Sequence, residues 1–149
     1  FYMNGNAADM EEECNRYASL LKQYPTDMVF LGIGENTHVA FNDPHVAFFD
    51  DKKDVKIVDL DEKNRLQQVD PEDTSCFKTL EEVPTHAITL TVPALFRATY
   101  AYAIVPGEKK AEAIYYTLNS EISERYPSTV FRKHNHSILY IDENSASRL

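Results

Sequence analysis

Cysteine is scarce in this sequence, and the two that occur, Cys14 and Cys76, lie far apart without a metal-binding spacing. We interpret them as reduced thiols of a cytoplasmic protein, with a disulfide as the alternative. Apolar runs are short, and none approaches the roughly 18 residues that span a bilayer. No basic leader followed by an apolar segment is visible either, so we expect neither a signal peptide nor a membrane partner.

Basic residues are also outnumbered, since 15 lysines and arginines stand against 24 aspartates and glutamates, for a net charge of −9. Phosphate backbones bind to basic surfaces, so this balance argues against nucleic acid as a partner. It does not exclude a small anionic ligand. A few backbone N–H groups and one lysine can hold a phosphate even in an acidic protein.

The 149 residues are enough for one domain, and strand and helix patterns alternate along them. We predict helices at residues 9–24, 61–69 and 108–118, and strands at residues 28–31, 55–60, 87–92, 100–105 and 137–141. Residues 70–84 show little periodicity and are expected to form a loop or lid. The alternation predicts an α/β sheet with helices on its faces.

The stretch GIGENTHVAFNDP, residues 32–44, follows the first predicted strand, an apolar run that we expect to be buried. Ligands of open α/β sheets bind at the carboxyl ends of strands. An imidazole beside a carboxylate is the usual means of proton transfer near neutral pH, which makes His38 a candidate catalytic residue. The alternative is a tight turn in which Gly32 and Gly34 supply positive φ angles.

Two further patterns could bind a ligand. Lys110 lies where strand 100–105 and Gly107 lead into a helix, and free N–H groups at such a place favour an anion. The alternative is a solvated helix residue. His134 and His136 form an H-x-H pair that could bind a metal, but no third ligand is evident nearby, so an exposed strand edge is the favoured interpretation.

The stretch LGIGENTHVAFNDP resembles the motif G-x-G-x-[DN]-G-H-[IV]-[AG]-F-N-E-P of the glucosamine-6-phosphate deaminase family, which includes galactosamine-6-phosphate isomerases. Other segments resemble the family in the same order: GNAADMEEECNRYASLL, IVDLDEKNR, VPTHAITLTVPALFRA and PGEKKAEAI. The resemblance implies a Rossmann-like three-layer αβα sheet. It also implies an aldose–ketose isomerase that releases ammonia from an aminosugar phosphate, with no metal and no organic cofactor.

In this family the motif histidine opens the sugar ring with the help of two polar neighbours. Carried over residue by residue, these catalytic residues are His38, Asp43 and Asn36. The family lysine that contacts the substrate phosphate falls on Lys110. Ring opening needs one proton delivered to the ring oxygen and one removed from the anomeric hydroxyl, and an imidazole can transfer both. We therefore expect a small sugar phosphate as partner, and a homo-oligomer.

Four positions depart from the family pattern. Asn36 cannot accept or store a proton as aspartate does. Thr37 replaces a glycine, which predicts a backbone that avoids strongly left-handed angles there. Asp43 is one methylene shorter than the usual glutamate, so we expect its contact with His38 to need a shift or a water. Cys76 stands where the family often has a phosphate-binding arginine.

The family's Ser-Gly-Gly phosphate loop and the aspartate that abstracts the C2 proton precede the first helix, and no such loop occurs in residues 1–149. The chain also begins with Phe1. We therefore expect residues 1–149 to be the C-terminal portion of a larger single domain of about 250 residues, inactive alone. The alternatives are a non-catalytic sugar-phosphate-binding module or regulator, and a 6-phosphogluconolactonase-like hydrolase.

Overall fold

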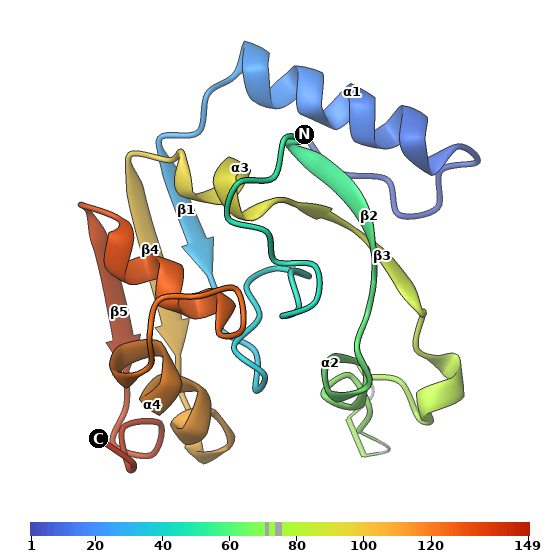
Figure 1. The fold of residues 1–149 in the computed structure, drawn as a ribbon. Helices are drawn as coiled ribbons and strands as arrows, with labels where there is room; N and C mark the ends of the chain where they lie inside the picture. Colours follow the sequence, from blue (N-terminus) through green and yellow to red (C-terminus); the bar gives the residue numbers. More distant parts are fainter. Residues whose placement is uncertain (71, 74–75) are drawn as a thin grey trace.

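The computed structural model describes residues 1–70, 72–73 and 76–149 (Figure 1). Its elements in chain order are α1 (Met10–Gln23), β1 (Met28–Leu31), β2 (Val55–Asp59), α2 (Glu62–Leu66), η1 (Leu80–Glu82), β3 (His86–Leu90), α3 (Val92–Phe96), β4 (Tyr100–Val105), η2 (Glu108–Lys110), α4 (Ala111–Asn119), η3 (Pro127–Lys133) and β5 (Ser137–Ile141), where η is a 3-10 helix. The predicted α/β class is confirmed, and β1, β4 and β5 have the predicted bounds.

The strands β1, β4 and β5 form a parallel sheet in that spatial order. Met28 lies opposite Tyr100 at the start of the first pair. Because the strands are parallel, the carboxyl ends of β1 and β4 lie at the same edge of the sheet. The segments after Leu31 and after Val105 therefore start side by side, and these are the two polar stretches that the sequence indicated.

The strands β2 and β3 form a separate antiparallel pair, in which Val55 lies opposite Leu90. They do not join the parallel sheet, whereas a simple alternation of strands and helices would predict that they do. Helix α1 covers this pair, with Cys14 packed in a small core against Val55 and Ile88. The helix begins as predicted at Asp9, whose carboxylate accepts a hydrogen bond from the backbone N–H of Glu12 at 2.9 Å.

The main core lies between one face of the parallel sheet and the elements α3, α4 and η3. Strand β4 contributes the small side chains of Ala101 and Ala103, which let the helices approach closely. Ile114 of α4 is fully buried there. Phe131 of η3 packs edge-on against Phe96, with ring centroids 4.8 Å apart. This packing fixes the sheet edge that carries the two polar stretches.

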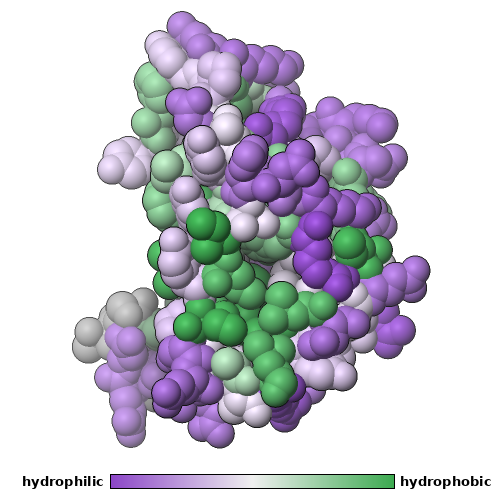
Figure 2. All heavy atoms as spheres, turned by 90° about the vertical axis from the view of Figure 1, so that its left-hand side faces the viewer, coloured by the Kyte–Doolittle hydropathy of each residue, from purple (hydrophilic) through white to green (hydrophobic). Residues whose placement is uncertain are grey.

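The opposite face of the parallel sheet is exposed, which corrects the prediction that β1 is a buried strand. Met28 is 45% exposed and Phe30 is 65% exposed, because no described helix covers them. We call the following residues the open sheet face: Met28, Phe30, Tyr100, Ile104, Ile138 and Tyr140, all exposed. Figure 2 views the molecule from the side of β5 and shows a band of hydrophobic side chains bordered by hydrophilic ones.

Three elements differ in extent from the prediction. Helix α2 is shorter than the helix predicted at residues 61–69, because the chain leaves the helical conformation after its C-cap Gln67. The helix predicted at residues 108–118 starts as the 3-10 turn η2, so Lys110 ends this turn and is the N-cap residue of α4. The predicted loop at residues 70–84 contains η1, and its positions 71, 74 and 75 lie outside the described residues.

Within the described chain no helix has the length and apolar character of a membrane span.

Candidate active site

The segment after β1 forms a tight turn between Gly34 and His38. The backbone N–H of Gly34 donates to the carbonyl of His38 at 2.9 Å, and that of Thr37 donates to the carbonyl of Gly34 at 2.9 Å. Positive φ angles occur at Thr37 (69°) and Ala40 (51°), and not at Gly32 or Gly34. The prediction that Thr37 avoids left-handed angles is therefore wrong, and so is the assignment of positive φ to the two glycines.

A left-handed conformation is costly for a β-branched residue such as Thr37, so the surroundings must hold it. Its side chain is buried, and its carbonyl accepts a hydrogen bond from the backbone N–H of Ser128 at 2.9 Å. The 3-10 helix η3 thus stabilises the turn from a distant part of the sequence.

A glycine is needed at position 34 because of its contact with His38. A Cβ atom on residue 34 would overlap the imidazole atoms Cε1, Nδ1 and Nε2, whereas a Cβ atom on Gly32 would meet open space. The imidazole therefore packs flat against the backbone at Gly34. This contact fixes the position of the ring from one side.

The predicted residues Asn36, His38 and Asp43 come together at Nδ1 of the ring. Nδ1 of His38 lies 2.6 Å from Oδ1 of Asn36 and 3.2 Å from Oδ1 of Asp43. The expectation that the shorter Asp43 needs a shift or a water to reach His38 is therefore wrong. The His38 side chain is 12% exposed, so the ring is largely enclosed while it keeps an opening to solvent.

Asp43 is fully buried, and both of its carboxylate oxygens accept hydrogen bonds. The donors are Asn36 Nδ2 at 2.8 Å, Asn64 Nδ2 at 3.0 and 3.1 Å, and the backbone N–H of Asp61 at 3.0 Å. Burial alone raises the pKa of Asp43, but these hydrogen bonds and the contact with His38 outweigh burial and lower the pKa to about 2. Asp43 is therefore a carboxylate at neutral pH.

The start of α2 supplies two site residues, Asp61 and Asn64, that the sequence interpretation missed. Oδ1 of Asp61 accepts from the backbone N–H of Asn64 at 2.7 Å, which is an ordinary helix cap. Oδ2 of Asp61 accepts from Nδ2 of Asn36 at 2.6 Å. A D-x-x-N pattern at a helix start predicts only the cap, so the contact with the motif becomes visible only in three dimensions.

Lys110 and His38 line the same hollow of about 310 Å³, together with Gln67. Nζ of Lys110 donates to Oε1 of Gln67 at 3.1 Å. Burial lowers the pKa of Lys110, the neighbouring Glu35 partly opposes this, and nearby lysines lower the pKa further. The ammonium group is thus partly desolvated, and within the described residues its hydrogen-bond partner is the amide of Gln67 and not a carboxylate.

A second hollow of about 880 Å³ shares Lys110 and Gln67 with the first. It is also lined by Lys63, Lys109 and Cys76. Cys76 and Lys110, the candidate for anion binding, therefore line the same hollow.

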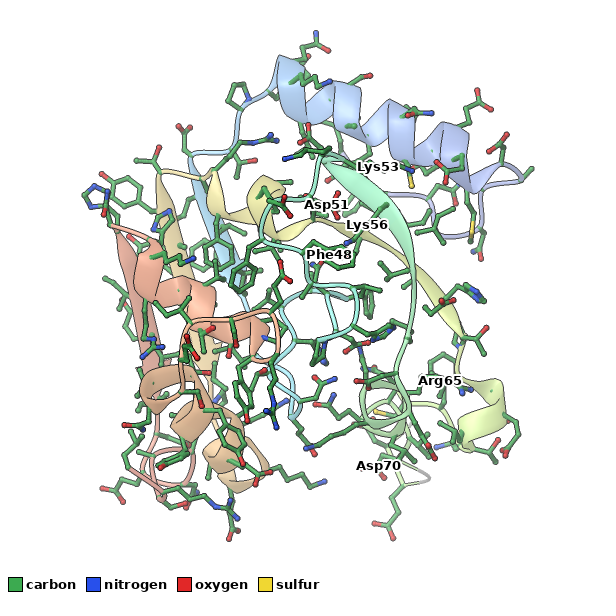
Figure 3. The ribbon with its side chains drawn as sticks, in the orientation of Figure 1. Phe48, Asp51, Lys53, Lys56, Arg65 and Asp70 are labelled. Atoms are coloured by element: carbon green, nitrogen blue, oxygen red, sulfur yellow. The ribbon has the colours of Figure 1, made fainter. Side chains whose placement is uncertain are left out.

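Two contacts of buried or half-buried cations hold the segments that carry the site (Figure 3). Nζ of Lys56, on β2, donates to Oδ2 of Asp51 at 2.7 Å and lies 5.1 Å from the ring centroid of Phe48. Arg65, on α2, donates to the carbonyl of Leu80 at 2.7 Å. The first contact fixes the loop that follows Asp43, and the second fixes α2 against η1.

The H-x-H pair does not form a metal site in the structure. Nε2 of His134 lies 2.8 Å from the carbonyl oxygen of Ala98, and its Nδ1 accepts from the backbone N–H of His136 at 3.2 Å. No group of three His, Cys, Asp or Glu side chains is placed to hold a metal ion in the part of the chain that the structure describes.

The hollow lined by His38 and Lys110 thus brings together an imidazole, a candidate for proton transfer, and an ammonium group, a candidate for anion binding. The buried carboxylate of Asp43 lies 3.2 Å from Nδ1 of His38, and an imidazole beside a carboxylate is a group that can take up a proton and return it. A partly desolvated ammonium group favours an anion such as a phosphate. The arrangement fits a small anionic ligand on which two protons are exchanged.

Sequence comparison identifies relatives over almost the whole chain. Residues 1–140 match the family described as glucosamine-6-phosphate isomerases/6-phosphogluconolactonase. A glucosamine-6-phosphate deaminase of Bacillus cereus (strain B4264) is 39% identical over 144 residues, which cover 97% of this chain and 52% of that protein. One from Bacillus thuringiensis (strain Al Hakam) is 38% identical over the same shares. The chain spans about half the length of these curated relatives.

Solved structures agree with this match. A structure described as a monomeric glucosamine-6-phosphate deaminase has a TM-score of 0.89 and 33% identity, and the match covers 100% of this chain and 59% of that chain. A 6-phosphogluconolactonase from Thermotoga maritima has a TM-score of 0.61 and 20% identity, over 89% of this chain and 51% of that one. The second likeness is one of fold alone.

Proposed function

The chain belongs to the family of glucosamine-6-phosphate isomerases and 6-phosphogluconolactonases, and on this basis we propose that it supplies the ring-opening site of an aminosugar-6-phosphate deaminase. The reaction is an aldose–ketose isomerisation that releases ammonia. The observation that carries the proposal is the contact of His38 with both Asn36 and the buried Asp43, in a hollow that Lys110 also lines.

In the proposed reaction His38 takes the proton of the anomeric hydroxyl and delivers a proton to the ring oxygen. Asp43 stays ionised, because its pKa is about 2, and it stabilises the imidazolium between the two transfers. Asn36 bridges the two residues through its amide. Lys110, which lines the same hollow, holds the phosphate through a charge-assisted hydrogen bond.

We further propose that residues 1–149 are the C-terminal portion of a larger single domain, which we call the complete protein. The chain spans 52% of the length of its relative from Bacillus cereus. The open sheet face supports the same interpretation, since its large apolar side chains are exposed in this chain. Covering such a face is worth roughly 25 cal/mol per Å². The phosphate loop and the C2 base implied by the family resemblance would lie in the remaining portion, so this chain alone is expected to be inactive.

The cytoplasmic location and the homo-oligomer are also proposals. Both Cys14 and Cys76 are free, which fits a reducing compartment. The solved deaminase that shares 33% identity is described as monomeric. Sedimentation of the complete protein at several concentrations tests the oligomer, and a single monomeric species at all of them would contradict it.

The activity is tested by incubating the complete protein separately with glucosamine-6-phosphate, galactosamine-6-phosphate and 6-phosphogluconolactone. We expect ammonia and a ketose phosphate from one of the two aminosugar phosphates. Hydrolysis of the lactone without ammonia release would identify the sister activity instead. Binding of the sugar phosphates without turnover would indicate a non-catalytic binding module, and either of these results contradicts the proposal.

A further inference from the structure

The side-chain amide of Asn36 has only one orientation that satisfies its neighbours. Its Nδ2 lies 2.8 Å from Oδ1 of Asp43 and 2.6 Å from Oδ2 of Asp61. Its Oδ1 accepts from the backbone N–H of His38 at 3.1 Å. The reversed amide would turn an oxygen toward two carboxylates and an NH₂ group toward an N–H group. These contacts therefore decide which amide atom faces the imidazole.

The fixed amide in turn fixes the protonation of the imidazole. Nδ1 of His38 lies 2.6 Å from Oδ1 of Asn36, and a carbonyl oxygen can only accept a hydrogen bond. Nδ1 must therefore carry a hydrogen. In the neutral ring Nε2 then carries the lone pair, and it is the nitrogen that can take a proton.

Asparagine at position 36 makes this arrangement depend on a neighbour. A carboxylate would accept from Nδ1 in either orientation, because both of its oxygens are acceptors. An amide presents an acceptor or a donor, according to how it is turned. Asp61 is the carboxylate that holds Nδ2 away from the ring, and among the described residues it forms no hydrogen bond or ion pair with His38 itself. Asp43 also contacts Nδ1 of His38 directly, at 3.2 Å, so its effect on the tautomer does not pass through Asn36 alone.

We propose that Asp61 is a positioning residue for His38, which acts through Asn36 to select the Nδ1–H tautomer and to leave Nε2 free as the base. The effect of this positioning role on turnover rests on the proposed function, whereas its effect on the tautomer of His38 does not. The competing explanation is that Asp61 serves only as the cap of α2, through its other oxygen and the backbone N–H of Asn64.

The tautomer can be measured directly in the complete protein labelled with ¹⁵N-histidine. The signals of His38 are assigned by their loss in His38→Gln, at about pH 8, above the ordinary range of histidine pKa values. We expect a protonated Nδ1 and an unprotonated Nε2 in the unmodified protein. The experiment needs no substrate, so its result stands whether or not the protein proves to be a deaminase.

The variant Asp61→Asn keeps the size and the capping oxygen but presents an NH₂ group to the NH₂ group of Asn36. We expect the Nε2–H form of His38 to increase, because the amide of Asn36 loses one of the three contacts that hold its orientation. Loss of the outer residue of an orienting chain commonly costs about 10- to 100-fold, so we expect kcat to fall by that factor. KM should change by less than about threefold, since the loss concerns the chemical step.

Two further variants separate positioning from capping. Asp61→Ser keeps a good capping side chain but removes the contact with Asn36. Unlike Asp61→Asn, it presents no NH₂ group to Asn36, so its tautomer change should be smaller, at similar thermal stability. The double variant Asn36→Asp, Asp61→Asn exchanges donor and acceptor between the two positions. The new carboxylate at position 36 can accept from His38 and from the new amide, so we expect the Nδ1–H tautomer to return. Its other contact is then with the carboxylate of Asp43, at a place where Asn36 donates at 2.8 Å, so we expect kcat to recover only in part.

The proposal is overturned if Asp61→Asn leaves the tautomer of His38 unchanged. It is also overturned if three results occur together. Asp61→Asn and Asp61→Ser lower kcat by the same factor, this loss follows a lower melting temperature, and the double variant gives no recovery. A role of Asp61 in capping alone predicts that pattern. Should the complete protein deaminate no aminosugar phosphate, the spectra still test the role of Asp61, and the failure would lie with the proposed function.

Discussion

The imidazole of His38 occupies the space that a side chain on Gly34 would need. We predict that Gly34→Ala displaces the ring from Asn36 and Asp43 while the fold persists, because Gly34 has no positive φ. Correctly placed acid–base groups contribute about 10²–10⁴ in rate, so kcat of the complete protein should fall within that range. Steady-state kinetics and a melting curve measure the two effects separately.

Gly32→Ala is the matched control, because a Cβ atom there meets open space. Gly32 lines the same hollow as His38, so this variant is expected to change KM at most and to leave kcat nearly unaltered. Equal losses of kcat in the two variants would contradict the importance of the contact between Gly34 and His38.

The proposed ring-opening role of His38 predicts a selective loss of activity. In the complete protein, His38→Gln should slow turnover of the cyclic aminosugar phosphate far more than that of an acyclic analogue, because the acyclic compound needs no ring opening. A purely structural histidine predicts a lower melting temperature and equal losses on both compounds. Equal kinetic losses with an unchanged melting curve would also contradict the role.

The low pKa of Asp43 predicts how stability changes with acid. The carboxyl group titrates at about 2 in the folded state and near its ordinary value of 3.8 when unfolded. Between these values the unfolded state binds the proton more strongly, so acidification favours unfolding. The contribution of about 2 kcal/mol is fully present above about pH 5 and is lost as the pH falls to about 2. Urea unfolding of the complete protein between these pH values measures it.

Asp43→Asn supplies the comparison for that measurement, since an amide does not titrate. The variant should be less stable near neutral pH, where the charged hydrogen bonds are lost, and the gap to the unmodified protein should narrow as the pH is lowered. A constant difference in the free energy of unfolding across this range would mean that Asp43 does not have a depressed pKa.

The local parts of the fold could be predicted from the sequence, and the pairings between distant parts could not. Asp9 and Pro25 bound α1 through a cap and a helix break, and apolar β-formers give β1, β4 and β5. The antiparallel pairing of β2 with β3 depends on tertiary contacts that no local pattern encodes. The exposure of Phe30 could not be predicted either, because an apolar run looks the same whether or not a second layer covers it.

The candidate site divides in the same way. Asn36, His38 and Asp43 lie within one motif, so their proximity was predictable from the sequence. Thr37 adopts a left-handed conformation that its side chain disfavours, and the hydrogen bond from Ser128 that helps hold it comes from η3. Asp61 has a sufficient local explanation as a helix cap, which hides its second contact with Asn36. Residues with two roles are the ones that local patterns miss.

The open sheet face predicts that residues 1–149 associate more strongly when isolated than the complete protein does. Exposed apolar area is worth roughly 25 cal/mol per Å², so several hundred Å² would favour association. Light scattering over a concentration series should show this, and Phe30→Lys should weaken it. Tyr2→Lys is the control, since Tyr2 is 95% exposed and lies outside the face. A stable monomer at high concentration would contradict the prediction.

Lys110 is predicted to be the principal phosphate-binding cation that this chain supplies. It is the N-cap residue of α4, next to backbone N–H groups that favour an anion, and it lines both hollows beside Gln67. In the complete protein, Lys110→Met should weaken binding of the phosphorylated sugar by roughly 1.5–3 kcal/mol, the range for hydrogen bonds to charged groups. Binding of the unphosphorylated sugar should stay about as weak as before.

Lys109 is the internal control for that measurement. It is exposed and lines the larger hollow but not the one that contains His38, whereas Lys110 lines both. Lys109→Met should therefore leave the phosphate dependence nearly intact, because a fully solvated lysine contributes little to binding an anion that lies elsewhere. Equal losses in the two variants would show a diffuse electrostatic effect of the lysine cluster. An unchanged phosphate dependence in Lys110→Met would place the phosphate against other groups, and the assignment of Lys110 would then be wrong.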